Sequence, residues 1–135
     1  KIKDFIRQEC DRSGLDKAIV HGHSKGAAIA TLCALDLAYN FKEKYISGFV
    51  EGSPRVGNKA FVESFQKYLP DFSNFEFGSD LIPQFPPKVF GYESVGKQIH
   101  IGPERRKGLG TKKDHAWAKS FIALTEELAE GVFYS

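Results

Sequence analysis

Apolar residues recur in this chain with two periods, one typical of helices and one typical of buried strands. Ile2, Phe5, Ile6 and Cys10 follow one another at helical spacing, and Gly14 then provides a stop signal. Side chains three and four residues apart share one face of a helix, so this spacing predicts an amphipathic helix at the start of the chain.

The same period predicts three further helices. The segment 25–39 is apolar on nearly all sides, which is typical of a helix that is covered on most of its surface. Asn58 is the predicted N-cap of the next helix, which Pro70 ends and whose apolar face is Phe61, Val62, Phe65, Tyr68 and Leu69. A last helix is expected after Asp114, with an apolar face of Trp117, Phe121, Leu124 and Leu128.

Four short runs of β-branched and aromatic residues predict strands at 18–21, 45–51, 75–77 and 95–101. Because helix and strand alternate through the first three strands, the chain should form parallel β-α-β units. We therefore expect an α/β fold, with a parallel sheet and helices on both faces. No internal repeat or linker divides the sequence, so residues 1–135 are expected to form a single domain.

Composition and charge narrow the class of protein. The 135 residues are 41% hydrophobic and 27% charged, which is enough apolar material for one hydrophobic core. The formal charge of +2 is too small to favour nucleic acid as the main partner. No apolar run reaches the length of a membrane span, and no signal peptide is visible.

Two further features concern the origin of the chain. Cys33 lies in the most apolar predicted helix and is expected to pack as a small hydrophobe, and Cys10 ends the first helix, so no disulfide framework is predicted. This usage leans toward a reducing, intracellular compartment, and localisation is otherwise open. The chain begins at Lys1 and contains no methionine, so we expect it to be part of a longer protein.

The stretch from His21 to Gly26 carries the clearest chemical signal, because it places G-x-S-x-G between an apolar strand and an alanine-rich helix. A serine at such a corner is held in a strained turn, and only glycine is expected to fit at positions 22 and 26. The turn exposes the hydroxyl and aims the first N–H groups of the helix at the atom that it attacks. Ser24 is therefore the candidate nucleophile, and the alternative is a small-residue turn without chemistry.

A serine nucleophile needs a histidine to take its proton and a carboxylate to orient that histidine. In G-x-S-x-G hydrolases these partners follow in the order serine, acid, histidine, at the carboxyl ends of successive strands. Asp80 lies just after the strand 75–77, and His115 lies beyond the following strand. Order and placement therefore predict Ser24, Asp80 and His115 as a catalytic triad.

Other carboxylates fit the role of the acid less well. Asp36 lies within the register of the apolar helix and is expected to meet a polar neighbour or solvent. Asp71 precedes its strand and so lies at the wrong end of it. Asp114 adjoins the candidate base, but its expected role is to cap the last helix.

The remaining histidines are also weaker candidates for the base. His100 alternates with Ile99 and Ile101 and so points away from that apolar face. His21 and His23 are spaced like metal ligands, but no third ligand with suitable spacing stands nearby. Packed, hydrogen-bonded histidines are therefore expected there, and neither a metal nor an organic cofactor is predicted.

Several motifs together resemble the fungal-type, class-three triacylglycerol lipases. The most diagnostic is G-x-P-R-V-G-N at 52–58, since many hydrolases share G-x-S-x-G alone. The resemblance extends from about Lys17 to Phe121 and rests, in chain order, on Gly22-His23-Ser24, the segment 52–61, Asp80-Leu81-Ile82-Pro83, Pro86-Pro87, Phe90-Gly91-Tyr92 and Asp114-His115. It implies an α/β-hydrolase fold and carboxylic ester hydrolysis, and it assigns Ser24, Asp80 and His115 the same three roles.

The resemblance also implies roles for neighbouring residues. The first oxyanion-hole donor is the backbone N–H of Lys25, the residue after the nucleophile. Pro54, Ile82 and Phe85 are implied to line the acyl pocket, although Ile82 and Phe85 could equally be plain core. The family's second oxyanion donor, lid and N-terminal sheet strands are not found in this chain. The chain is therefore expected to be the C-terminal, triad-bearing part of an α/β-hydrolase domain.

Three departures from the family pattern carry information. Lys25 replaces a leucine and could favour an anionic substrate, but we expect its stem to pack and its head to reach water. Ala27 replaces a second glycine and suits the helix. Glu51 stands where an aromatic residue is common, which suggests a more polar pocket.

The interpretation that these residues favour is a serine carboxylic-ester hydrolase of lipase type. Its partners would be acylglycerols, related lipid esters or small esters, and a lipid interface. One alternative is a non-catalytic, lipase-like module for lipid binding or interaction, against which an intact triad argues. Another is a basic surface at 104–113 that binds anionic membrane or nucleic acid, although such a charge run is more typical of a solvated loop.

Overall fold

The computed structural model describes residues 2–102, and the predicted last helix lies outside this range. The helices are α1 (Ile2–Ser13), α2 (Lys25–Asn40) and α3 (Lys59–Tyr68), with 3-10 helices η1 (Ile82–Gln84) and η2 (Lys88–Phe90). The strands are β1 (Lys17–His23), β2 (Tyr45–Glu51), β3 (Gly57–Asn58), β4 (Ser73–Phe77), β5 (Tyr92–Glu93) and β6 (Lys97–Ile101). None of the described helices has the length and apolar character that a membrane crossing requires.

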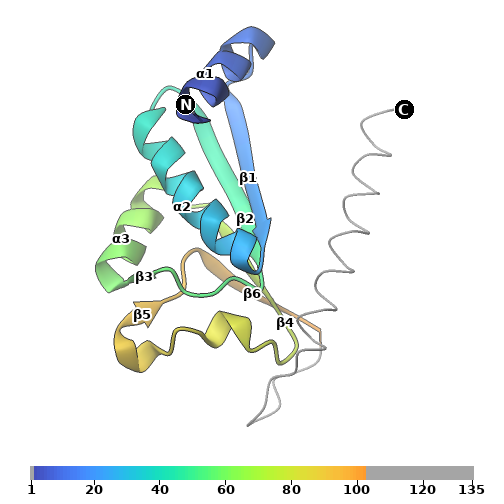
Figure 1. The fold of residues 1–135 in the computed structure, drawn as a ribbon, viewed down its shortest axis with the longest axis vertical. Helices are drawn as coiled ribbons and strands as arrows, with labels where there is room; N and C mark the ends of the chain where they lie inside the picture. The colour runs from blue at the N-terminus through green and yellow to red at the C-terminus, as the bar shows by residue number, and fades with distance from the viewer. Residues whose placement is uncertain (1, 103–135) are drawn as a thin grey trace.

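Four parallel strands form the main sheet, in the order β1-β2-β4-β6 (Figure 1). The crossover between β1 and β2 contains α2, and the crossover between β2 and β4 contains α3. The predicted parallel β-α-β units are therefore confirmed. Since parallel strands all run the same way, the loops that follow β1, β2 and β4 meet at one edge of the sheet.

One hydrophobic core lies between the sheet and the helices α2 and α3. Val50 of β2 and Phe72, just before β4, are fully buried. The ring of Phe65, from α3, meets the ring of Phe72 edge-on with centroids 4.9 Å apart. Burial of one such side chain stabilises the fold by about 1.5–3 kcal/mol. The helix α2 approaches the sheet closely because its buried face consists mainly of small residues, namely Ala27, Ala30, Thr31 and Ala34, with Leu37.

The prediction that the second helix is covered on most sides is wrong for the described part of the chain. Ile29 and Leu32 of α2 are 60% and 51% exposed. The small residues of the helix make most of the contact with β1 and β2, and Ile29 and Leu32 are left on the outer face. Apolar residues all around a helix therefore did not mean burial all around it.

The helices α2 and α3 lie on the same face of the main sheet (Figure 1). Along β2, Ile46, Gly48 and Val50 face these helices and are buried, whereas the alternate residues are less so. On the other face, Ile19 of β1 is 73% exposed. Within residues 2–102, α2 and α3 therefore lie on one face of the sheet, and the predicted last helix lies outside these residues.

A short antiparallel ribbon of β3 and β5 was not predicted from the sequence. Gly57 pairs with Glu93, and Asn58 pairs with Tyr92. The side chain of Asn58 also accepts the N–H of Phe61 at 3.0 Å, which confirms the predicted N-cap of α3. The ribbon thus ties the start of α3 to the segment that follows η2.

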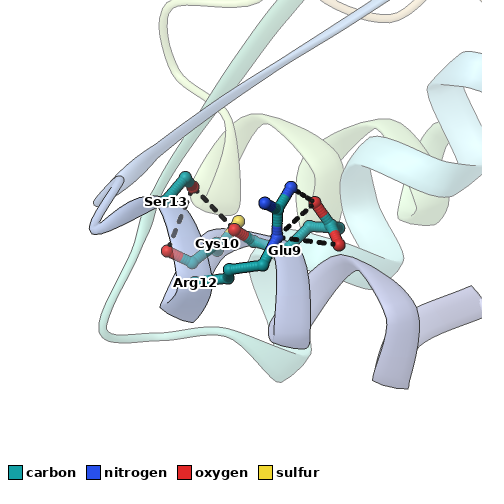
Figure 2. A network of polar contacts seen from close by, with 4 residues as sticks. All are labelled: Glu9, Cys10, Arg12 and Ser13. Atoms are coloured by element: carbon teal, nitrogen blue, oxygen red, sulfur yellow. Dashed lines mark hydrogen bonds and ion pairs between the residues drawn. The ribbon is translucent and has the colours of Figure 1, made fainter.

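Local polar contacts hold the last turn of α1, at the opposite end of β1 from the G-x-S-x-G corner (Figure 1 and Figure 2). Arg12 forms an ion pair with Glu9, one turn earlier, and the hydroxyl of Ser13 donates to the carbonyl of Glu9 at 2.6 Å. Arg12 remains 76% exposed, so the pair contributes little to stability.

Candidate active site

Ser24 occupies the strained corner between β1 and α2 that the sequence predicts. Its φ of 56° and ψ of −124° place it in a region of backbone space that glycine strongly favours. Its N–H donates to the carbonyl of Glu51, at the end of β2, at 3.0 Å. A non-glycine residue keeps such a conformation only where its surroundings enforce it, and costs of about 1–3 kcal/mol are typical.

The two glycines beside Ser24 have different roles. A Cβ atom on Gly22 would lie 2.5 Å from the carbonyl oxygen of Gly26 and 2.8 Å from the Cβ of Ala30, so only glycine fits there. A Cβ atom on Gly26 would meet no described atom within 4 Å. The expectation that both positions exclude a side chain is therefore confirmed for Gly22 and wrong for Gly26. The close approach is that of β1 to the first turn of α2.

Lys25 begins α2, and its side chain is exposed, as expected for a lysine whose head reaches water. The carbonyl of Ser24 accepts the N–H of Ala27 at 3.0 Å and so closes the first turn of the helix. The partial positive charge at a helix N-terminus therefore lies next to Ser24.

Asp80, the candidate acid, lies just after β4 and is only 2% exposed. Its N–H donates to the carbonyl of Phe77 at 3.0 Å, and its Oδ1 accepts the N–H of Ile82 at 2.9 Å. This environment suits a carboxylate that is held in one orientation.

The fold brings Ser24 and Asp80 to the same edge of the main sheet, where β1 and β4 end on either side of β2. That arrangement agrees with the order and placement from which the triad was predicted. His115, the candidate base, lies outside the described residues.

The three predicted pocket residues follow β2 and β4. Pro54 is half-buried, and its carbonyl accepts the hydroxyl of Ser53 at 3.0 Å. Ile82 is half-buried at the start of η1. Phe85 is 53% exposed and so is not part of the core formed by the described residues.

Glu51 and His21 form a pair that the sequence did not reveal. Glu51 Oε2 lies 3.0 Å from His21 Nε2, and the two side chains are 13% and 27% exposed. The ring of His21 also packs against that of Phe49, with centroids 4.5 Å apart. The packed, hydrogen-bonded histidine expected at position 21 is confirmed. The carboxylate of Glu51 is directed to a histidine of the neighbouring strand.

The less favoured candidates lie where the sequence places them. Asp36 is exposed and forms an ion pair with Lys3 at 2.7 Å. Asp71 is also exposed, and its Oδ2 accepts a hydrogen bond from the hydroxyl oxygen of Tyr45, 3.1 Å away. His100 is exposed on β6, with Ile99 and Ile101 on the opposite face. Among the described residues, no cluster of three or more His, Cys, Asp or Glu side chains could hold a metal ion.

Sequence reasoning gave no role to Arg55, which follows β2. Its guanidinium Nη1 donates to the carbonyls of Gln84 and Pro86, and its backbone N–H donates to the carbonyl of Phe85 at 2.7 Å. No periodicity could have revealed these contacts, because the acceptors are backbone atoms about 30 residues away. The only available signal was the position of Arg55 within G-x-P-R-V-G-N.

The N–H of Ile82 is a second contact that was missed, although the sequence offers a signal for it. An aspartate side chain often accepts the N–H two residues later in a turn, and Pro83 favours a turn here. The run Asp80-Leu81-Ile82-Pro83 therefore fits the bond from Ile82 to Asp80.

An open groove of about 670 Å³ lies beside the loop that follows β4. Its lining is polar and carries both signs of charge: Arg55, Glu76, Lys88, Glu93, Ser94, Gln98 and His100.

A sequence model of the family described as lipase (class 3) matches residues 2–90. Phospholipase A1-II 5 of Oryza sativa subsp. indica is 34% identical over 102 residues, which cover 69% of this chain and 21% of that protein. A secreted mono- and diacylglycerol lipase of Malassezia globosa is 29% identical over 103 residues, which cover 76% of this chain and 34% of that protein. The chain thus spans between a fifth and about a third of these relatives.

Solved structures agree with the sequence matches. A lipase from Rhizopus microsporus var. chinensis superposes with a TM-score of 0.69 at 32% identity, covering 73% of this chain and 35% of that one. A triacylglycerol lipase whose catalytic centre is formed by a serine protease triad superposes with a TM-score of 0.67 at 29% identity, covering 73% and 38%. These are α/β-hydrolase folds, so the predicted fold class is confirmed.

Proposed function

The chain belongs to the class 3 lipase family, and from that premise we propose that it carries the catalytic triad of a serine hydrolase that cleaves carboxylic esters of lipids. Ser24 is the nucleophile, Asp80 the acid and His115 the base. The single observation that carries the proposal is the strained backbone of Ser24, with a φ of 56°, between β1 and α2.

The reaction proceeds through an acyl-enzyme. His115 takes the proton of the Ser24 hydroxyl while the oxygen attacks the ester carbonyl carbon. The tetrahedral intermediate then expels the alcohol, to which His115 returns the proton. Water, deprotonated by His115, attacks the acyl-enzyme and releases the carboxylic acid and free Ser24.

The surroundings of Asp80 support its role as the acid. A buried carboxylate with one oxygen already bound by the N–H of Ile82 can turn its other oxygen toward an imidazole N–H. The charge of Asp80 then stabilises the imidazolium that forms when His115 takes the proton.

The negative oxygen of the tetrahedral intermediate needs at least two aligned donors. The backbone N–H of Lys25 is the first, at the positive end of α2. We propose that residues outside this chain supply the second donor, and that this chain is the triad-bearing, C-terminal part of the hydrolase domain. Removal of one such donor typically costs about 100- to 1,000-fold in rate.

Lipid esters are the proposed substrates. The similar proteins are named as a phospholipase A1, as mono- and diacylglycerol lipases and as a triacylglycerol lipase. Acylglycerols or related lipid esters at a lipid interface are therefore the first substrates to test, with small soluble esters as a comparison. No observation favours the non-catalytic alternative, since the relatives are named as enzymes.

The test is covalent labelling of the full-length protein with a fluorophosphonate, followed by peptide mapping. An adduct on Ser24 that is absent from the Ser24→Ala variant is the expected result. Asp80→Asn should label far more slowly at neutral pH, because the imidazole loses its orienting carboxylate. If a folded full-length protein forms no adduct, the hydrolase proposal is wrong.

A further inference from the structure

We propose that Arg55 is a positioning residue of the triad: it holds the loop that carries Asp80 in the orientation that catalysis requires. The inference rests on the proposed function, since it assumes that Asp80 is the acid. It assigns a role to the arginine of G-x-P-R-V-G-N through its contacts in this fold.

Arg55 donates hydrogen bonds to three consecutive backbone carbonyls of the loop after β4. The guanidinium Nη1 donates to the carbonyls of Gln84 and Pro86, the latter at 2.8 Å, and the backbone N–H of Arg55 donates to the carbonyl of Phe85 at 2.7 Å. Bonds from a charged donor are about twice as strong as those between neutral groups. One residue therefore fixes the path of the chain from 84 to 86.

The same loop is tied back to Asp80 by a second set of bonds. The side-chain amide of Gln84 donates to the Asp80 carbonyl at 3.3 Å, and the N–H of Phe85 donates to the carbonyl of Ile82 at 3.0 Å. The N–H of Ile82 in turn donates to Asp80 Oδ1 at 2.9 Å. These hydrogen bonds, together with the short chain segments between them, thus connect the guanidinium of Arg55 to Asp80.

The anchor of this arrangement is the main sheet. Arg55 follows Gly52-Ser53-Pro54 directly after β2, and the N–H of Gly52 donates to the carbonyl of Phe75, on β4, at 2.9 Å. Arg55 is half-buried, so its charge is only partly screened by water. The end of β2 also accepts the N–H of Ser24. The same strand end therefore fixes the position of Asp80 relative to Ser24.

The residue type fits the task. A guanidinium is planar and permanently charged, and it presents its donors in a rigid fork that can bind two carbonyls at once. A lysine in its place would offer one flexible ammonium group, which is strongly hydrated. Arg55→Lys should therefore keep part of the function, and Arg55→Met, which retains the apolar stem and removes the donors, should keep least.

The experiment measures the pH profile of kcat/KM, with kcat and KM, for ester hydrolysis by the full-length protein. We compare Arg55→Met, Arg55→Lys and Asp80→Asn with the wild type, and use Arg12→Met as a matched control. Arg12 is an arginine on α1 whose pair with Glu9 is exposed (Figure 2). Rates are expressed per mole of folded protein, as judged by circular dichroism and cooperative unfolding.

The expected result is a loss of kcat of about 10- to 100-fold in Arg55→Met, with little change in KM, because a catalytic group misplaced by about 1 Å costs on that order. A carboxylate beside a histidine raises the pKa of the imidazolium. When Asp80 is misplaced, this pKa falls, so the acid limb of the profile should move to lower pH. Arg55→Lys should show a smaller change of the same sign, and Arg12→Met none.

Three outcomes would overturn the inference in different ways. If Arg55→Met has the wild-type kcat and acid limb per mole of folded protein while Asp80→Asn is impaired, Asp80 is the acid but Arg55 does not position it. If Asp80→Asn itself equals the wild type, the assignment of the acid is wrong, and the role of Arg55 falls with it. Should Arg55→Met fail to fold, wild-type behaviour of Arg55→Lys across kcat and the pH profile would overturn the inference.

Discussion

The backbone carbonyl of Glu51 accepts the N–H of Ser24 at 3.0 Å, so the last residue of β2 fixes the residue that follows β1. The side chain of Glu51 is held as well, by His21 on β1. The strained corner is thus supported from the neighbouring strand and does not depend on its own two flanking elements alone.

We expect Gly22→Ala to destabilise the protein and Gly26→Ala to be tolerated. The added methyl group at position 22 would collide with the carbonyl of Gly26 and with Ala30, and such overpacking typically costs about 1–3 kcal/mol. At position 26 it meets no described atom, and alanine favours a helix over glycine by up to about 1 kcal/mol. Urea unfolding of both variants measures the difference, and equal free energies of unfolding would contradict it.

Replacement of Ser24 should separate backbone strain from chemistry. Release of the strain at φ 56° is expected to yield about 1–3 kcal/mol, against an entropic cost of glycine of about 0.5–1 kcal/mol. Ser24→Gly should therefore exceed Ser24→Ala in free energy of unfolding by up to about 2.5 kcal/mol, while both variants lack hydrolysis. A Ser24→Gly protein less stable than Ser24→Ala would show that the corner is not strained.

The pair of His21 and Glu51 should show measurable coupling in a double-mutant cycle. Both side chains are largely buried, so the hydrogen bond should be worth about 1 kcal/mol at neutral pH. The exposed pair of Arg12 and Glu9 provides the control, with an expected coupling below about 0.5 kcal/mol. Thermal and urea unfolding of the variants in each cycle give the two energies, and a coupling no larger than that of the control would contradict the assignment.

Cys33 should react slowly with alkylating reagents at neutral pH. Burial raises the pKa of its thiol, and the nearby negative charge of Asp36 raises that pKa further. Since the thiolate is the nucleophile, a raised pKa leaves less of it at neutral pH and moves the rise in reactivity to higher pH. Iodoacetamide labelling followed by mass spectrometry tests this, with the urea-unfolded protein as reference. Asp36→Asn should speed the reaction, and a native rate equal to the unfolded rate would refute the prediction.

Much of the fold was accessible from the sequence because local patterns determine it. The β-branched runs became strands, and Asn58 capped α3 as its position before the apolar face suggested. The short ribbon of β3 and β5 was not accessible, because two-residue strands have no periodicity to detect. Nor could the pattern of α2 tell which apolar side chains would face the sheet. The alanine side chains of α2 face the sheet because their small size allows the helix to approach the sheet closely.

The candidate site likewise has features that local sequence patterns predict and contacts that they do not predict. The positions of Ser24 after β1 and Asp80 after β4 were accessible because each follows a strand in the expected order. The contacts of Arg55 and the pair of His21 with Glu51 were not, since each joins residues that lie about 30 positions apart. Such contacts depend on the register between strands, which the hydrophobic pattern of one strand cannot specify.

The parallel order β1-β2-β4-β6 has a consequence for how the protein folds. Neighbouring parallel strands of this sheet cannot be joined by a tight hairpin. Each pairing, such as Val20 with Gly48 or Val50 with Asn74, therefore forms only after a long connecting segment has brought its two ends together. Folds dominated by such distant contacts form slowly. The corner at Ser24 and the loop at Asp80 therefore cannot preassemble in a short nascent segment, and both depend on a late, cooperative closure of the strands between them.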